Sequence, residues 1–275
     1  MNNTFSFKRF GTYFVSDLRN TFNNTSLTVL ITSLAGLIAY IFCGVMNLVI
    51  SGEWSSYELP GRLISFIILF YILIIIVPSK AYGFFTDKRR GSFYTLVPAS
   101  PLEKTLSMLI NVAVLAPLAY IAIALAADAL LCLVDPGCGQ PLAAAIFSGA
   151  SELSEGLEEL NSNARFTVLS MGELTLGIFL NILGWTLTFL LGALYFKKNK
   201  IGKTILVMIA FSMVMSMFTT PILMNAGEGF IEMIDATPDA QRSMNLLKGG
   251  IFALSTVANL GLIVWTYLRV RTVKH

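Results

Sequence analysis

Six long apolar stretches dominate the pattern of hydrophobic and polar positions along the chain. Each approaches or exceeds the ~20 residues that cross a hydrocarbon core of ~30 Å as an α-helix. We therefore expect an all-α, polytopic membrane protein whose six transmembrane helices lie within residues 27–275. The stretches cover residues 27–50, 63–79, 105–134, 174–196, 204–224 and 249–268.

The polar connections between these stretches alternate in charge. Residues 1–26, 80–104, 197–203 and 269–275 together carry 15 Lys and Arg but only three Asp and Glu. The alternate connections carry four basic and twelve acidic residues. Because basic loops stay in the cytosol, both termini are predicted to be cytosolic. Residues 135–172 then form a long acidic outer loop, in which a leucine stripe predicts a short helix.

The N-terminal segment 1–26 is polar and aromatic rather than continuously apolar. Phe10, Phe14, Leu18 and Phe22 repeat every four residues, and the basic residues fall largely elsewhere around the helix. This pattern is typical of an amphipathic helix lying in the cytosolic membrane interface. A frayed, aromatic-rich tail is the alternative.

Composition agrees with a membrane protein. Apolar residues make up 55% of the chain and charged residues 13%, about half the charged fraction of a typical soluble domain. The three cysteines show no metal-binding spacing. Cys132 and Cys138 flank a turn, so a disulfide and two buried thiols both remain open.

The sequence offers no catalytic constellation. Its one histidine is His275, which excludes histidine-based triads and metal clusters. Gly202-Lys203-Thr204 matches the end of a phosphate-binding loop, but Lys197 stands where that motif needs a glycine. We therefore expect no enzyme activity, no cofactor or metal site in this chain, and no nucleic-acid partner.

A few polar residues and one proline interrupt the apolar stretches. Asn111, Asn181 and Asn259 either form hydrogen bonds between helices or line a solute pathway. Asp128 either lies at the outer interface or lines that pathway. Pro117 removes a helical hydrogen bond and is expected to kink the third helix. These five residues are the candidates for a pathway or a gate.

Small residues repeat every four positions on the fourth stretch, at Gly184, Thr188 and Gly192. Such a ladder lets two helix backbones approach closely. We expect it to form a packing seam between helices.

The most specific stretch is the cytosolic segment 86–104. From residue 88 it reads Lys-Arg-Arg-Gly-Ser-Phe-Tyr-Thr-Leu-Val-Pro-Ala-Ser-Pro-Leu-Glu-Lys. Ser100 can cap the third helix, with Pro101 at its first position and Glu103 at its third. On these residues alone, the segment can be a well-capped helix start that needs no partner.

At this stretch the chain resembles the membrane permease subunits of bacterial ABC transporters of the type-two, exporter-like class. The six helices, cytosolic termini and amphipathic first segment extend the resemblance along the chain. It implies a multi-pass protein of the bacterial inner membrane that assembles with a second permease subunit and with separate ATP-binding subunits. It also implies export of a solute and a cytosolic segment that contacts the ATPase through Arg89, Arg90, Phe93, Tyr94, Leu96, Glu103 and Lys104.

Two other function classes fit the same pattern. A secondary transporter could be built from two inverted halves of three helices, although no ionisable pair is evident at mid-membrane. A membrane scaffold without transport is the other possibility. The solute, the direction of transport and the choice between homodimer and heterodimer are left open by the sequence.

Overall fold

The computed structural model describes residues 5–86, 91, 97–163, 167, 169–217 and 240–272, and all regular structure in these ranges is helical. Six helical segments are long and apolar enough to cross a membrane, which confirms the predicted number of spans. The elements are α1 (Phe7–Ser51), α2 (Leu59–Tyr82), η1 (Gly83–Thr86), α4 (Pro101–Leu109), η2 (Ile110–Leu115), α5 (Ala116–Val134), η3 (Pro136–Cys138), α6 (Leu142–Asn163), α7 (Met171–Tyr195), a helix at Lys200–Met217, and α9 (Ala240–Thr272).

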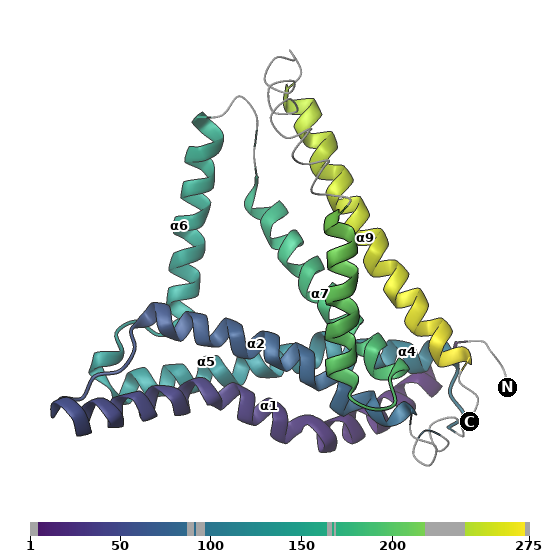
Figure 1. Ribbon diagram of the computed structural model, residues 1–275, viewed down its shortest axis with the longest axis horizontal. Helices are drawn as coiled ribbons and strands as arrows, with labels where there is room; N and C mark the ends of the chain where they lie inside the picture. Colours follow the sequence, from purple (N-terminus) through teal and green to yellow (C-terminus); the bar gives the residue numbers. More distant parts are fainter. Residues whose placement is uncertain are drawn as a thin grey trace.

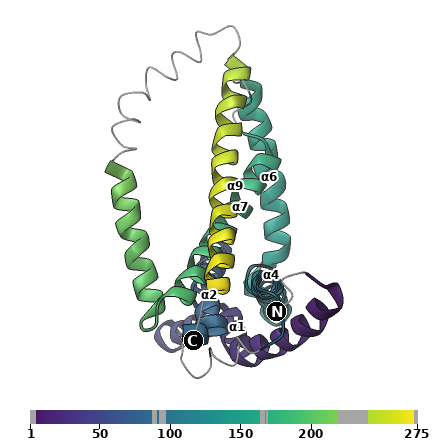
Figure 2. The same ribbon diagram turned by 90° about the vertical axis from the view of Figure 1, so that its right-hand side faces the viewer.

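The long helices form two groups that meet near one end. Helices α1, α2 and α5 lie side by side, whereas α7, α9 and the helix Lys200–Met217 rise steeply from this layer (Figures 1 and 2). The start of α1 and the end of α9 lie at the same end of the layer, beside α4 (Figure 1). The end of α2 and the start of the third span therefore lie at the junction of the two groups.

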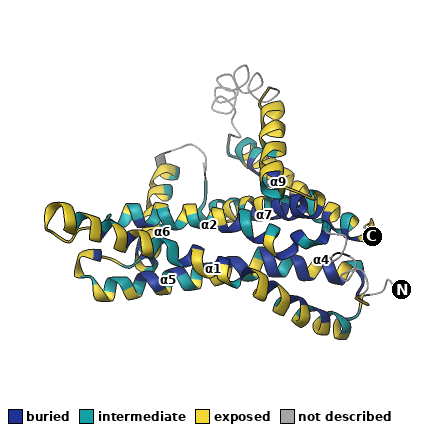
Figure 3. Cartoon of the chain, turned by 60° about the horizontal axis from the view of Figure 1, so that its bottom comes forward, coloured by how far each residue is buried: buried dark blue, intermediate teal, exposed yellow. Residues whose placement is uncertain are grey.

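The best-packed region of the described chain is this junction. Figure 3 shows buried positions gathered around α1, α4 and α7, while most of α9 is exposed. Tyr82, Phe85, Met108 and Leu194 are almost completely buried there and belong to one apolar cluster. Close packing, rather than water exclusion, is what holds membrane helices together, so this region is the structural anchor of the molecule.

The first helix is longer than predicted. α1 runs without interruption from Phe7 to Ser51, so the predicted domain boundary at residue 26 falls inside a helix. Its buried positions near the start are Tyr13, Asp17 and Thr21, whereas the side chain of Phe22 is 65% exposed. The packing face of this half is therefore largely polar, and the phenylalanine stripe lies beside it.

The third span contains an irregular turn next to Pro117. It consists of α4, the π-helical turn η2 and α5, and the Ala116 N–H bonds to the carbonyl of Asn111 five residues earlier. A π-helical turn directly before a proline accommodates the hydrogen bond that proline cannot donate. Pro117 predicted where the third helix becomes irregular. The form that the irregularity takes, a π-helical turn, was not predicted.

The segment 135–172, which the charge pattern predicts to be an outer loop, holds more helix than predicted. α6 extends over 22 residues, from Leu142 to Asn163, where the sequence suggested a short helix. It stands away from the α1, α2 and α5 layer (Figures 1 and 2).

Candidate functional site

The predicted contact with an ATPase is only partly visible. Arg89, Arg90, Phe93, Tyr94 and Leu96 lie outside the described residues. Glu103 and Lys104 open the third span, and both are buried. Their burial means that, in this structure, neither presents its side chain on the surface to a partner.

Glu103 is the centre of a dense set of hydrogen bonds. Arg9 donates to both of its carboxylate oxygens, at 2.8 and 2.7 Å, and the Ser6 N–H donates at 2.9 Å. Ser100 and Glu103 also form the reciprocal capping box that the sequence predicted. The same carboxylate thus caps α4 and holds the start of α1.

A second link joins elements that are distant in sequence and belong to the connections predicted to be cytosolic. The Lys200 ammonium group donates to the carbonyl of Gly83, and the Thr86 hydroxyl donates to the carbonyl of Phe196 at 3.3 Å. The connection between the fourth and fifth spans is therefore tied to the end of the second span, where the segment 86–104 begins.

A cavity of about 650 Å³ opens between the first half of α1 and residues 97–99. Polar groups of α1 form one side of the cavity. Apolar groups of η1 and of residues 97–99, just before α4, form the other side. Its lining includes Arg9, Tyr13, Asp17, Asn20, Phe84 and Pro98.

Beside this cavity, four polar side chains from four elements (α1, α2, α4 and η2) meet in the interior. Asp17 Oδ2 accepts from the Tyr82 hydroxyl at 2.8 Å, from the Ser107 hydroxyl at 2.5 Å and from Asn111 Nδ2 at 3.1 Å. Asn111 Nδ2 also donates to the Tyr82 oxygen at 2.9 Å. Asn111, a predicted pathway residue, is thus a member of a buried cluster, which we call the Asp17 cluster (Asp17, Tyr82, Ser107 and Asn111).

At the opposite end of α2 lies a buried ion pair. Arg62 Nη1 donates to Asp128 Oδ1 at 2.7 Å, and the two side chains are 3% and 7% exposed. The other Asp128 oxygen accepts from the Leu142 N–H at 2.6 Å, at the start of α6. Asp128 therefore joins α2, α5 and α6, which is a structural role rather than an open position at the interface.

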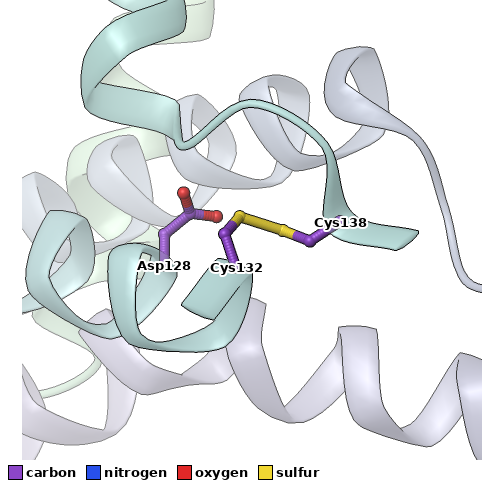
Figure 4. Close-up of side chains that lie close together, drawn as sticks. All are labelled: Asp128, Cys132 and Cys138. Carbon is purple, nitrogen blue, oxygen red and sulfur yellow. A yellow bond between two sulfur atoms is a disulfide. The ribbon is translucent and has the colours of Figure 1, made fainter. Parts of the chain in front are cut away.

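A disulfide between Cys132 and Cys138 closes the turn beside this pair (Figure 4). Arg62 Nη2 donates to the carbonyls of Cys138 and Gln140, at 2.7 and 2.8 Å. Asp128 and the two sulfurs lie close together. However, the sulfurs are bonded to each other and cannot act as the thiolates that a metal ion needs. We call Arg62, Asp128, Cys132 and Cys138 the outer clasp.

The turn carries a second acidic anchor at Asp135. Hydrogen bonds from the Trp54 indole at 2.8 Å, the Gly137 N–H at 2.9 Å and the Tyr40 hydroxyl at 2.9 Å lower the pKa of Asp135. These contacts favour the ionised carboxylate and tie the end of α1 to the turn. No motif in the sequence indicated this arrangement.

The small-residue ladder on α7 forms the expected packing seam. A Cβ atom built on Gly184 would lie 3.2 Å from Asn259 of α9, and one on Gly192 would overlap Thr204 of the next helix. Asn259 donates to the carbonyl of Leu180 at 3.1 Å. Of the two readings of Asn259, the structure supports the hydrogen bond between helices.

Asn181 takes a different position from the other asparagines. Its side chain is exposed on α7, so it does not join Asn111 or Asn259 in a common channel. Pro117 is buried next to the π-helical turn. The five predicted pathway residues thus occupy separate places along the molecule.

Comparisons with known proteins add nothing to this picture. No family model matches the chain, and neither the curated proteins nor the solved structures include a match. The chain has the six apolar helices of a multi-pass membrane protein. Its function has to be argued from its own residues.

Proposed function

We propose that this chain is the membrane-spanning permease subunit of an ATP-driven ABC transporter. It exports a solute, and a separate partner subunit binds and hydrolyses the ATP. Both termini and the segment 86–104 face the cytosol of a bacterial cell, and a second permease subunit completes the membrane part. The resemblance of the segment 88–104 suggested this function.

The observation that carries the proposal is the Arg9–Glu103 contact at the re-entry point of that segment. Glu103 is fully buried, caps α4 and binds both Arg9 and the Ser6 N–H. Hydrogen bonds between charged groups are short and about twice as strong as neutral ones. A displacement of the cytosolic segment would therefore move α1 and the third span together, as a subunit driven by an ATPase requires.

The third span also has a place where it can bend. The π-helical turn at residues 110–115 follows α4 without a gap. It ends two residues before Pro117. Such turns often mark functional sites in helices. A push on α4 can therefore change the angle between α4 and α5 without breaking either helix.

The outer clasp supports the proposed orientation. Disulfides form and persist outside the cytosol, in oxidising compartments, and the Cys132–Cys138 bond joins the end of α5 to the start of the acidic segment 135–172. The disulfide and the distribution of Lys and Arg thus both favour an orientation in which the segment 135–172 faces the outside of the cell.

Affinity purification of the tagged chain from its native membranes tests the proposal. An ATP-binding protein should co-purify with it, and the complex should hydrolyse ATP. Phe93→Ala with Tyr94→Ala should weaken this co-purification, because aromatic residues are typical interface anchors. Phe147→Ala is the matched control, since Phe147 is 78% exposed on α6, in the outer loop. A wild-type chain that recovers no ATP-binding protein would favour a secondary carrier or a scaffold instead.

A second pair of variants separates docking from transmission. Arg9→Gln removes the ion pair to Glu103 but leaves residues 86–104 unchanged. The ATPase should still bind, whereas stimulation of ATP hydrolysis by substrate should be lost. Arg19→Gln, at an exposed position of the same helix, should change neither property. Equal stimulation in the two variants would contradict the proposed transmission route.

A further inference from the structure

Asp17 is a buried carboxylate that forms no ion pair with any basic group in the described part of the chain. Its side chain is 6% exposed. The ion pairs within the described part of the chain are Arg9–Glu103, Arg62–Asp128 and Lys248–Glu173, and none of them includes Asp17. Taking an ionised carboxylate out of water without a counter-charge is costly, and such groups usually become neutral instead.

The described basic groups of α1, α2 and α4 make no ion pair with Asp17; Lys8 is exposed, and Arg62 pairs with Asp128 at the other end of α2. On α1, Arg9 binds Glu103, and Arg19 is exposed. On α2, the Lys80 ammonium group donates to the Thr28 hydroxyl at 2.7 Å. On α4, Lys104 lies one turn before Ser107 and makes no ion pair with Asp17.

The remaining members of the Asp17 cluster are neutral groups. The Ser107 hydroxyl can donate to a carboxylate or accept from a carboxylic acid. The Tyr82 oxygen already accepts from Asn111 and from the Thr21 hydroxyl, so the Tyr82 hydroxyl serves Asp17 as a donor. None of these groups supplies the positive charge that would stabilise an ionised carboxylate in the interior.

We propose that Asp17 is a proton-binding site, in which the Asp17 carboxyl group takes up one proton from the adjoining cavity and is held neutral against Tyr82, Ser107 and Asn111. Asp17 also lines the cavity of about 650 Å³, so a proton reaches it without crossing the apolar core. The proton adds to a carboxylate oxygen, and no other bond changes. This proposal does not depend on the transport function.

The bound proton controls how α1 packs against the third span. In the neutral state the cluster joins α1 to α2, α4 and η2 through hydrogen bonds alone. Loss of the proton leaves a charge among groups that cannot neutralise it. An unfolded aspartate is ionised at neutral pH, so the folded chain with a neutral Asp17 holds one more proton than the unfolded chain. The free energy of unfolding should therefore fall as the pH rises through the titration of this site.

Infrared spectroscopy of the purified full-length chain in nanodiscs tests the proposal. At neutral pH the wild type should show the C=O stretching band of a protonated carboxylic acid, and Asp17→Asn should lose it. Asp135→Asn is the matched control, because the contacts of Asp135 lower its pKa and keep it ionised. A band that survives Asp17→Asn unchanged would overturn the proposal.

Two further measurements keep the test decisive if Asp17→Asn folds poorly. Tyr82→Phe keeps the aromatic ring but removes the hydroxyl that contacts Asp17, so it should shift the band in a chain that retains Asp17. The melting temperature of the wild type should fall from neutral to alkaline pH equally in NaCl and in KCl. Absence of the band together with stabilisation by sodium alone would show a sodium site and refute the proton site.

Discussion

The Arg62–Asp128 pair is the contact in this structure whose loss should cost the most stability. Breaking a buried ion pair by removing one partner typically costs ~3–5 kcal/mol, because the other charge stays buried. Asp128→Leu leaves the Arg62 guanidinium with the carbonyls of Cys138 and Gln140 as its oxygen partners. Arg62→Leu leaves those carbonyls without this donor and Asp128 with the Leu142 N–H alone. We therefore expect each single variant to lose roughly 3–5 kcal/mol of unfolding free energy.

The double variant distinguishes a coupled pair from two independent contacts. With both charges gone, no unpaired ion remains buried at this site, so Arg62→Leu with Asp128→Leu should lose less than the sum of the single variants. Residues in direct contact show coupling energies of about 0.5–3 kcal/mol, and a buried pair belongs at the upper end. The residual loss comes from the unpaired carbonyls and the Leu142 N–H, at about 1–3 kcal/mol for each unsatisfied group.

Denaturation of the purified chain in mixed micelles, with the disulfide kept oxidised, measures these differences. The midpoint should shift strongly for each single variant and recover partly in the double variant. Strictly additive losses would refute the reasoning, because they would mean that Arg62 and Asp128 contribute separately. Single variants as stable as the wild type would show that the pair is solvated rather than buried.

Three further expectations follow from the seam, the disulfide and the charge distribution. Gly192→Ala should lower the free energy of unfolding by ~1–3 kcal/mol through overpacking, which a lower melting temperature would show. Gly202→Ala, where the new Cβ meets open space, should leave the melting temperature unchanged. Replacing both disulfide cysteines by serine should lower the free energy of unfolding by roughly 2 kcal/mol, and an unchanged denaturation midpoint would contradict this. In a cysteine-free background, an impermeant thiol reagent should label Ser154→Cys but not Ser92→Cys in intact cells, and the reverse result would invert the topology.

Local sequence patterns predicted the features that depend on neighbours along the chain. The six spans follow from segment length, because a helix must be long and apolar to cross a membrane. The capping box of Ser100 and Glu103 follows from residues three positions apart. The seam on α7 follows from small residues spaced by four, although the sequence did not show which helices pack against it.

Contacts between distant residues could not be derived in the same way. Arg62 and Asp128 are 66 positions apart, and Arg9 and Glu103 are 94 apart. Their pairing depends on how the helices cross, which no local pattern encodes. In the sequence, Asp17 stands out only as one of the few acids in a basic segment. Tyr13 and Thr21 lie four residues before and after it, on the same face of the helix. That spacing was the signal that this helix face packs against other helices.

Crosslinking tests most directly whether residues 86–104 contact an ATP-hydrolysing partner. A photoreactive amino acid at Phe93 should form an adduct with an ATP-binding polypeptide in native membranes, and the same amino acid at Ser154 should not. The adduct should decrease when ATP analogues that change the conformation of the ATPase are added. Adducts from position 93 with lipid alone, in membranes where the chain is intact, would contradict the account.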